Sequence, residues 1–102
     1  MPNPQQRLDP LVNGGGGAIT VGVASAQIIG INNQRWRLII HNPSASAVIY
    51  ICPASFGPAV VNGSGCLTIN AGAQLILDNT RACGAFNAIA SAAATPITIW
   101  EF

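Results

Sequence analysis

The stretch RWRLIIHNPSASAVIYICP, residues 35–53, decides how this chain folds. It holds two short apolar runs joined by the turn NPSAS, whose Asn, Pro and Ser are residues that turns favour. A sheet with one face in water alternates apolar and polar residues. Residues 38–40 and 48–51 are instead apolar in succession. We therefore expect the opposite sheet to cover one face of these strands and a partner chain to cover the other.

The rest of the chain continues in short strand-like segments separated by turns rich in glycine and proline. The segment 85–94, AFNAIASAAA, is ambiguous because alanine favours helices, but it lacks an N-terminal cap and ends just before Pro96. A strand is favoured there. Seven or eight short strands without a convincing helix predict an all-β fold, an antiparallel β-sandwich or jelly roll. The segments are 18–24, 27–31, 34–41, 46–52, 66–70, 73–79, 85–91 and 95–102.

The N-terminal residues 1–17 contain three prolines and a run of four glycines. Proline is excluded from regular ladder and helix positions, and glycine has little conformational preference. We therefore predict an extended arm with a hinge, followed by a sandwich domain at 18–102. Two interpretations of the arm stay open: a disordered tail, or a segment that orders only when laid across a neighbouring subunit.

Charge is scarce along the whole chain. Charged residues make up 7% of the sequence and none is lysine, whereas an average soluble domain has roughly 25%. A net charge of +1 argues against binding to nucleic acid, which requires a basic patch. The N-terminus has no signal-peptide pattern, and the sequence has no strongly apolar run of about 20 residues. We expect neither a nucleic-acid nor a membrane partner.

Groups that could perform catalysis are few and dispersed. His41 is the only histidine, and it stands just before a turn, where a solvent-facing or turn-bonded histidine is the usual case. The glycine run lacks the Gly-Lys-Ser/Thr ending of a phosphate-binding loop. The sequence therefore predicts no enzyme, no cofactor and no metal site. The three carboxylates are Asp9, Asp78 and Glu101.

Three cysteines, Cys52, Cys66 and Cys83, lack the spacing of a zinc site. They are predicted to be small buried thiols. A bridge between Cys52 and Cys66 stays open if the strands that carry them are neighbours.

The triplet Arg35-Trp36-Arg37 is expected to lie in a strand, where neighbouring side chains point to opposite faces. Trp36 is then predicted to enter the core. The two arginines would line the other face, where they can meet Glu101, Asp78 or acids of a neighbouring subunit.

Four segments, RWRLIIHNPS, VIYICP, NGSGCLTINAGAQLIL and AFNAIASAAATPITIWEF, follow one another in a recognisable order. Over residues 35–102 this order resembles the small β-sandwich virion proteins of tailed bacteriophages, many of which begin with an Arg-led strand and end near an acidic residue. The resemblance implies a non-enzymatic role in the virion, decorating or cementing the capsid. An accessory part of a neck, tail or fibre is the alternative.

The residues themselves point to a subunit that works in an assembly, since its strands are apolar on both faces and its charges are few. A homo-oligomer on a major capsid protein is expected, and a trimer would suit the local three-fold positions of a shell. A module that binds host glycan or receptor through Trp36, Tyr50 or residues 53–65 stays open. A cupin-like metal enzyme would need more than one histidine. The candidate subunit or shell contacts are Ile39, Ile49, Ile51, Ile97, Ile99, Arg35, Arg37, Leu11 and Val12.

Overall fold

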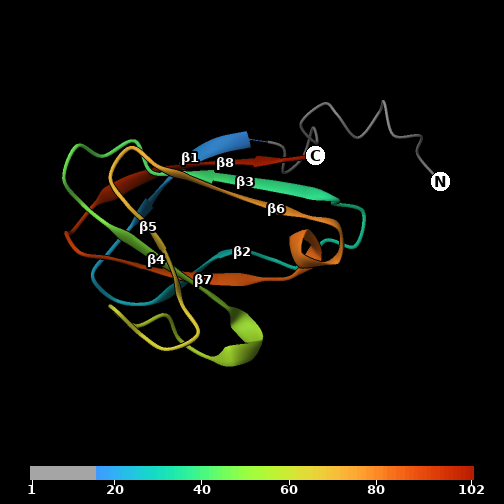
Figure 1. Cartoon of the computed structure of the whole chain (residues 1–102), viewed down its shortest axis with the longest axis horizontal. Coiled ribbons are helices and arrows are strands. Elements are labelled where there is room, and N and C mark those ends of the chain that lie inside the picture. Colours follow the sequence, from blue (N-terminus) through green and yellow to red (C-terminus); the bar gives the residue numbers. More distant parts are fainter. Residues whose placement is uncertain (1–15) are drawn as a thin grey trace.

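The computed structural model of this chain describes residues 16–102, and its eight strands form two packed antiparallel sheets (Figure 1). Sheet A has the strand order β1-β8-β3-β6, and sheet B has the order β2-β7-β4-β5. The strands are β1 (Gly16–Val21), β2 (Ala26–Ile29), β3 (Arg37–His41), β4 (Ile49–Pro53), β5 (Leu67–Ile69), β6 (Gln74–Asp78), β7 (Phe86–Ala90) and β8 (Thr95–Glu101).

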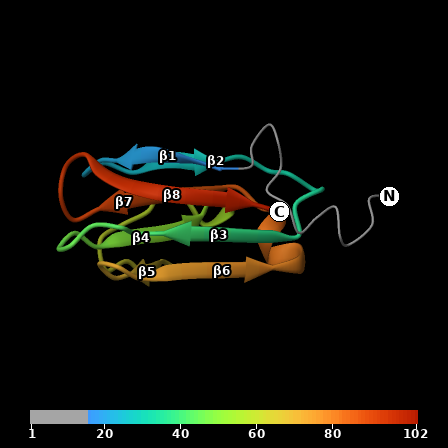
Figure 2. The ribbon, with the colours of Figure 1, turned by 90° about the horizontal axis from the view of Figure 1, so that it is seen from above.

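The chain passes from one sheet to the other at almost every connection, and only β4 and β5 are consecutive neighbours in one sheet. Seen from above, each strand of sheet A lies over a strand of sheet B: β1 over β2, β8 over β7, β3 over β4 and β6 over β5 (Figure 2). Two four-stranded sheets connected in this way form a jelly roll. The predicted all-β sandwich is confirmed, and the ambiguous alanine-rich segment supplies β7.

The core lies between the two sheets because alternate residues of each strand point inward. In β3, β7 and β8 every second residue is buried, which is the period of a strand. Burying an Ile or Leu side chain stabilises the fold by about 1.5–3 kcal/mol, so these inward rows supply most of the driving force. The core residues are Val21, Leu38, Ile40, Ile49, Ile51, Ile69, Ala82, Phe86, Ala88, Ala90, Ile97 and Ile99.

Four residues that we expected at a subunit or shell contact belong to this core: Ile49, Ile51, Ile97 and Ile99. In β4 the residues that point to either face are apolar, and in β8 Pro96 and Trp100 lie on the face opposite to Ile97 and Ile99. The sequence therefore did not show which face points inward. In the structure they share the interior with Leu38, and at most 7% of any of them is exposed. They are therefore not available to a partner chain.

The second face of β4 is covered by the chain's own residues 54–66, whereas the sequence led us to expect a partner there. Tyr50 and Cys52 point away from the core and are still buried. The covering segment starts with the 3-10 helix η2 (Ala54–Phe56) and lies on the side of sheet B away from sheet A (Figure 1). It is tied across that sheet by two hydrogen bonds, from Asn87 Nδ2 to the Gly57 carbonyl at 2.9 Å and from the Ala59 amide to Ser25 Oγ at 2.8 Å.

The start of the sandwich domain and one connection inside it differ from the sequence-based expectation. β1 begins at Gly16, where Gly16 pairs with Trp100 and Gly17 with Ile99, so the arm boundary placed after residue 17 falls inside a strand. Leu11 and Val12 lie outside the described residues. The connection between the expected strands 73–79 and 85–91 is formed by a 3-10 helix, η3 (Asn79–Cys83).

Arg35 closes one end of the sandwich from inside, which corrects its predicted place on an outer face. It is 1% exposed, and its Nη1 donates to Glu101 Oε1 at 2.6 Å. Its other nitrogens donate to backbone carbonyls of Gly30, Ala82 and Gly84. The strand alternation does not apply here because β3 starts only at Arg37.

Trp36 also precedes β3, and it is half-buried at the end of the sheet instead of in the core. The expected meeting of arginines with Glu101 and Asp78 does occur, since Arg35 pairs with Glu101 and Arg37 with Asp78.

Candidate functional surface

The outer face of sheet A presents an apolar row to solvent. The register pairs Ile39 of the central strand β3 with Trp100 on one side and with Ile76 on the other. Trp100 and Ile76 are each 47% exposed. The neighbouring row pairs His41 with Thr98 and with Gln74. We call this surface the sheet A face, and it consists of Arg37, Ile39, His41, Gln74, Ile76, Asp78, Thr98 and Trp100.

The only charges on the sheet A face neutralise each other. Arg37 Nε donates to Asp78 Oδ1 at 2.7 Å, and both side chains are partly exposed. The Arg37 guanidinium also lies 5.0 Å from the centre of the Trp36 ring, a distance at which a cation is attracted to an aromatic face. Phe102 extends the aromatic surface, with its ring centre 6.2 Å from that of Trp100. The face is therefore apolar and aromatic, with no net charge.

A shallow hollow of about 340 Å³ interrupts this face between Ile39, His41, Gln74, Thr98 and Trp100. The His41 Nδ1 atom is buried at this place and has no hydrogen-bond partner in residues 16–102. Buried polar atoms of this kind are uncommon, because leaving one unpaired costs about 1–3 kcal/mol. The hollow thus combines an exposed indole with the imidazole of His41, an amide and a hydroxyl.

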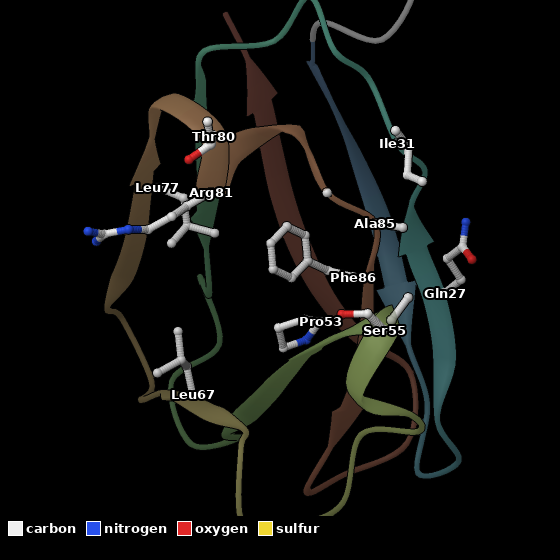
Figure 3. Close-up of a pocket in the computed structure, with 12 residues that line it drawn as sticks. Gln27, Ile31, Pro53, Ser55, Leu67, Leu77, Thr80, Arg81, Ala85 and Phe86 are labelled. Carbon is white, nitrogen blue, oxygen red and sulfur yellow. The ribbon is translucent and has the colours of Figure 1, made fainter.

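A larger cavity of about 710 Å³ opens on the sheet B side, at the end closed by η3. Figure 3 shows Phe86 in the middle, with Pro53 and Leu67 from the ends of β4 and β5 on one side of it and Leu77 of β6 above them. The Arg81 guanidinium points away from Phe86, past the rim. The cavity is lined mainly by apolar side chains, so it suits an apolar group.

The described part of the chain offers little else for chemistry. Within residues 16–102 no three His, Cys, Asp or Glu side chains gather closely enough to hold a metal ion. No helix in the same residues has the length and hydropathy needed to cross a membrane. All three cysteines are free thiols, Cys52 buried and Cys66 and Cys83 half-buried.

Of the predicted contact residues, the structure brings Ile39 and Arg37 together on the sheet A face. Sequence reasoning missed Ile76, Trp100, Gln74 and Thr98 there. The alternation of residues in β6 and β8 could have identified them, because Ile76 points to the same face as Asp78, and Trp100 points to the same face as Thr98. Of the residues that the alternative of a glycan- or receptor-binding module used, Tyr50 is buried, whereas the 53–65 segment leaves Phe56 and Val60 exposed.

Comparisons with known proteins add no relative. No protein family model matches this chain, and no curated protein sequence matches it. Its function is therefore inferred from the surfaces described above together with the resemblance of its segment order.

Proposed function

We propose that this protein is a non-enzymatic structural subunit of a bacteriophage virion, a capsid decoration or cement protein that assembles through its sheet A face. The exposed row of Trp100, Ile39 and Ile76 is the observation that carries this proposal. Contiguous exposed apolar surface marks interaction sites, and in this row the half-buried Ile39 connects the exposed Trp100 and Ile76. The occupant we assign to it is a second copy of this chain.

The composition of the sheet A face supports a protein contact. The central part of a protein interface is depleted of charge and enriched in aromatic residues, and tryptophan is among the commonest anchors of binding energy. On the sheet A face, Trp100 is such an aromatic residue. The ion pair of this face, Arg37 with Asp78, lies one row away from it. A face without net charge can also pack against the same face of a second copy, or against another surface of that copy, without charge repulsion.

The assembly that we propose is a closed trimer seated on the major capsid protein. In a closed ring every copy of the interface is occupied, whereas a contact whose rotation does not close leads to open filaments. The shell partner would then be met by surfaces that the trimer leaves free. The resemblance of residues 35–102 to phage virion proteins supports the virion as the place of action.

The native mass, measured by light scattering over a range of concentrations, tests this proposal. We expect the wild type to be a closed oligomer, and we expect Ile76→Lys to be a folded monomer because it places an uncompensated charge in the apolar row. The matched control is Val23→Lys, since Val23 is also apolar and exposed but lies outside the sheet A face. A monomeric wild type, or oligomers in all three proteins, would contradict assembly through this face.

A second candidate function is binding of a neutral sugar in the hollow beside Trp100, and the exposed indole flanked by the polar side chains of His41, Gln74 and Thr98 is the observation that favours it. A pyranose ring offers an apolar face that can stack on the indole. It also carries hydroxyl groups that can pair with His41, Gln74 and Thr98. No Asp, Glu, Lys or Arg side chain lines the hollow, which suits an uncharged ligand.

Titration with neutral monosaccharides, followed by tryptophan fluorescence, tests the sugar candidate. Binding that is lost in His41→Ala, while the native mass is unchanged, would favour sugar recognition. No saturable change with glucose, galactose or N-acetylglucosamine would exclude these sugars and leave assembly as the role of the sheet A face.

A further inference from the structure

Cys52 lies in β4, and Cys66 directly precedes β5, the neighbour of β4 in sheet B. The β4–β5 ladder ends at the pair of Ile51 with Leu67, and Cys52 and Cys66 are the next residues of the two segments in the same antiparallel register. Facing residues of adjacent antiparallel strands have Cα atoms about 4.5–5.5 Å apart. A disulfide needs Cα atoms about 4.4–6.8 Å apart, a range that includes the spacing of this register.

The two thiols are in contact in the reduced protein. Cys52 is hydrogen-bonded to Cys66, and burial, together with this neighbour, raises the pKa of the Cys52 thiol. Cys66 is half-buried and can be reached from solvent, whereas Cys52 is covered. Because the thiolate is the attacking species, Cys66 is the better placed of the two to react first.

Cys83 belongs to a different environment and provides an internal reference. It lies in η3, and its thiol donates to the Arg35 carbonyl oxygen at 2.9 Å. It has no facing cysteine in the strand register.

We propose that Cys52 and Cys66 are an oxidation site, forming an intramolecular disulfide when the protein meets an oxidant such as glutathione disulfide. The Cys66 thiolate attacks one sulfur of the oxidant, which releases one glutathione thiolate and leaves a mixed disulfide. Cys52 loses its proton and attacks the Cys66 sulfur, which releases the second glutathione. Two protein thiols are oxidised by two electrons, and one glutathione disulfide is reduced to two glutathione molecules.

The bond would fix the segment that covers sheet B. It would join the two ends of residues 53–65, the chain that buries the outer side of β4. Pro53 and Leu67, which directly follow the two cysteines, both line the large cavity, so the same bond would hold one of its walls. This inference does not depend on the proposed function.

Thiol counting on the full chain tests the proposal. The protein is incubated with glutathione disulfide or with dithiothreitol, unfolded, and alkylated, and its peptides are mapped by mass spectrometry. After oxidation we expect one alkylated cysteine, Cys83, and one peptide pair linked through Cys52 and Cys66. We also expect the oxidised protein to melt about 5 °C or more above the reduced protein, because a disulfide that closes such a loop restricts the unfolded chain.

Two variants keep the result unambiguous. Cys83→Ser should oxidise like the wild type and retain no free thiol, whereas Cys66→Ser should retain both of its thiols and show no rise in melting temperature. Three free thiols in the folded wild type after incubation with glutathione disulfide would overturn the proposal. A bond to Cys83, or a disulfide between two chains, would overturn it equally.

Discussion

Arg35 places its guanidinium inside the sandwich, where it donates to three backbone carbonyl groups and to the Glu101 carboxylate. It therefore joins the residue that directly follows β2, the 3-10 helix η3 together with the residue after it, and the last residue of β8. The sequence predicted that an arginine would meet Glu101 or Asp78, but it could not predict the direction of Arg35. That direction depends on where β3 begins, and hydrogen bonds to residues far along the chain decide it.

The buried ion pair leads to the first prediction. Arg35→Met leaves Glu101 buried without its partner, which should lower the free energy of unfolding by about 3–5 kcal/mol. Arg37→Met is the matched control, because the Arg37–Asp78 pair is partly exposed and should contribute about 1 kcal/mol or less. Chemical denaturation of both variants measures the difference.

Equal losses in the two variants would contradict the role given to Arg35. The double variant Arg35→Met with Glu101→Leu should recover part of the loss, since it removes both buried charges together.

At the scale of the elements, alternation and turn residues predicted all eight strands, and their ends differ by a few residues. The cover over β4 could not be predicted in the same way. Its two anchoring hydrogen bonds, from Asn87 to Gly57 and from Ala59 to Ser25, join residues about 30 positions apart, and neither residue pair carries a local sequence signal. For this reason a partner chain was expected where the protein covers itself.

The return of this covering segment depends on a close approach at Gly63. A Cβ atom there would lie 2.8 Å from Val60 Cβ and 2.9 Å from the Val60 carbonyl oxygen. Gly63→Ala should therefore force the turn before β5 to shift and destabilise the protein by about 1–3 kcal/mol.

Gly22→Ala is the control for that variant, because a Cβ at residue 22 meets no atom closer than 4.0 Å. It should change the free energy of unfolding by no more than about 0.5 kcal/mol. Thermal unfolding followed by circular dichroism compares the two variants with the wild type, and an undisturbed Gly63→Ala protein would contradict the close approach.

At the scale of the whole molecule, the jelly roll leaves its two outer faces in different states. Residues 54–66 cover sheet B, whereas the sheet A face exposes an apolar row with a balanced pair of charges at its edge. Composition predicted the shortage of charge, and the strand patterns predicted the sandwich. Neither could locate the exposed row, because Ile39, Ile76 and Trp100 come from three separate strands and meet only through the register of the folded sheet.

Covalent footprinting with hydroxyl radicals, read residue by residue by mass spectrometry, tests most directly whether the sheet A face is the assembly surface. Phe56, which is 71% exposed on η2, serves as the reference outside that face. Our account predicts that Trp100 is oxidised slowly relative to Phe56 in the wild type and in Val23→Lys, and much faster in Ile76→Lys. Equal oxidation of Trp100 in all three proteins would contradict assembly through the sheet A face.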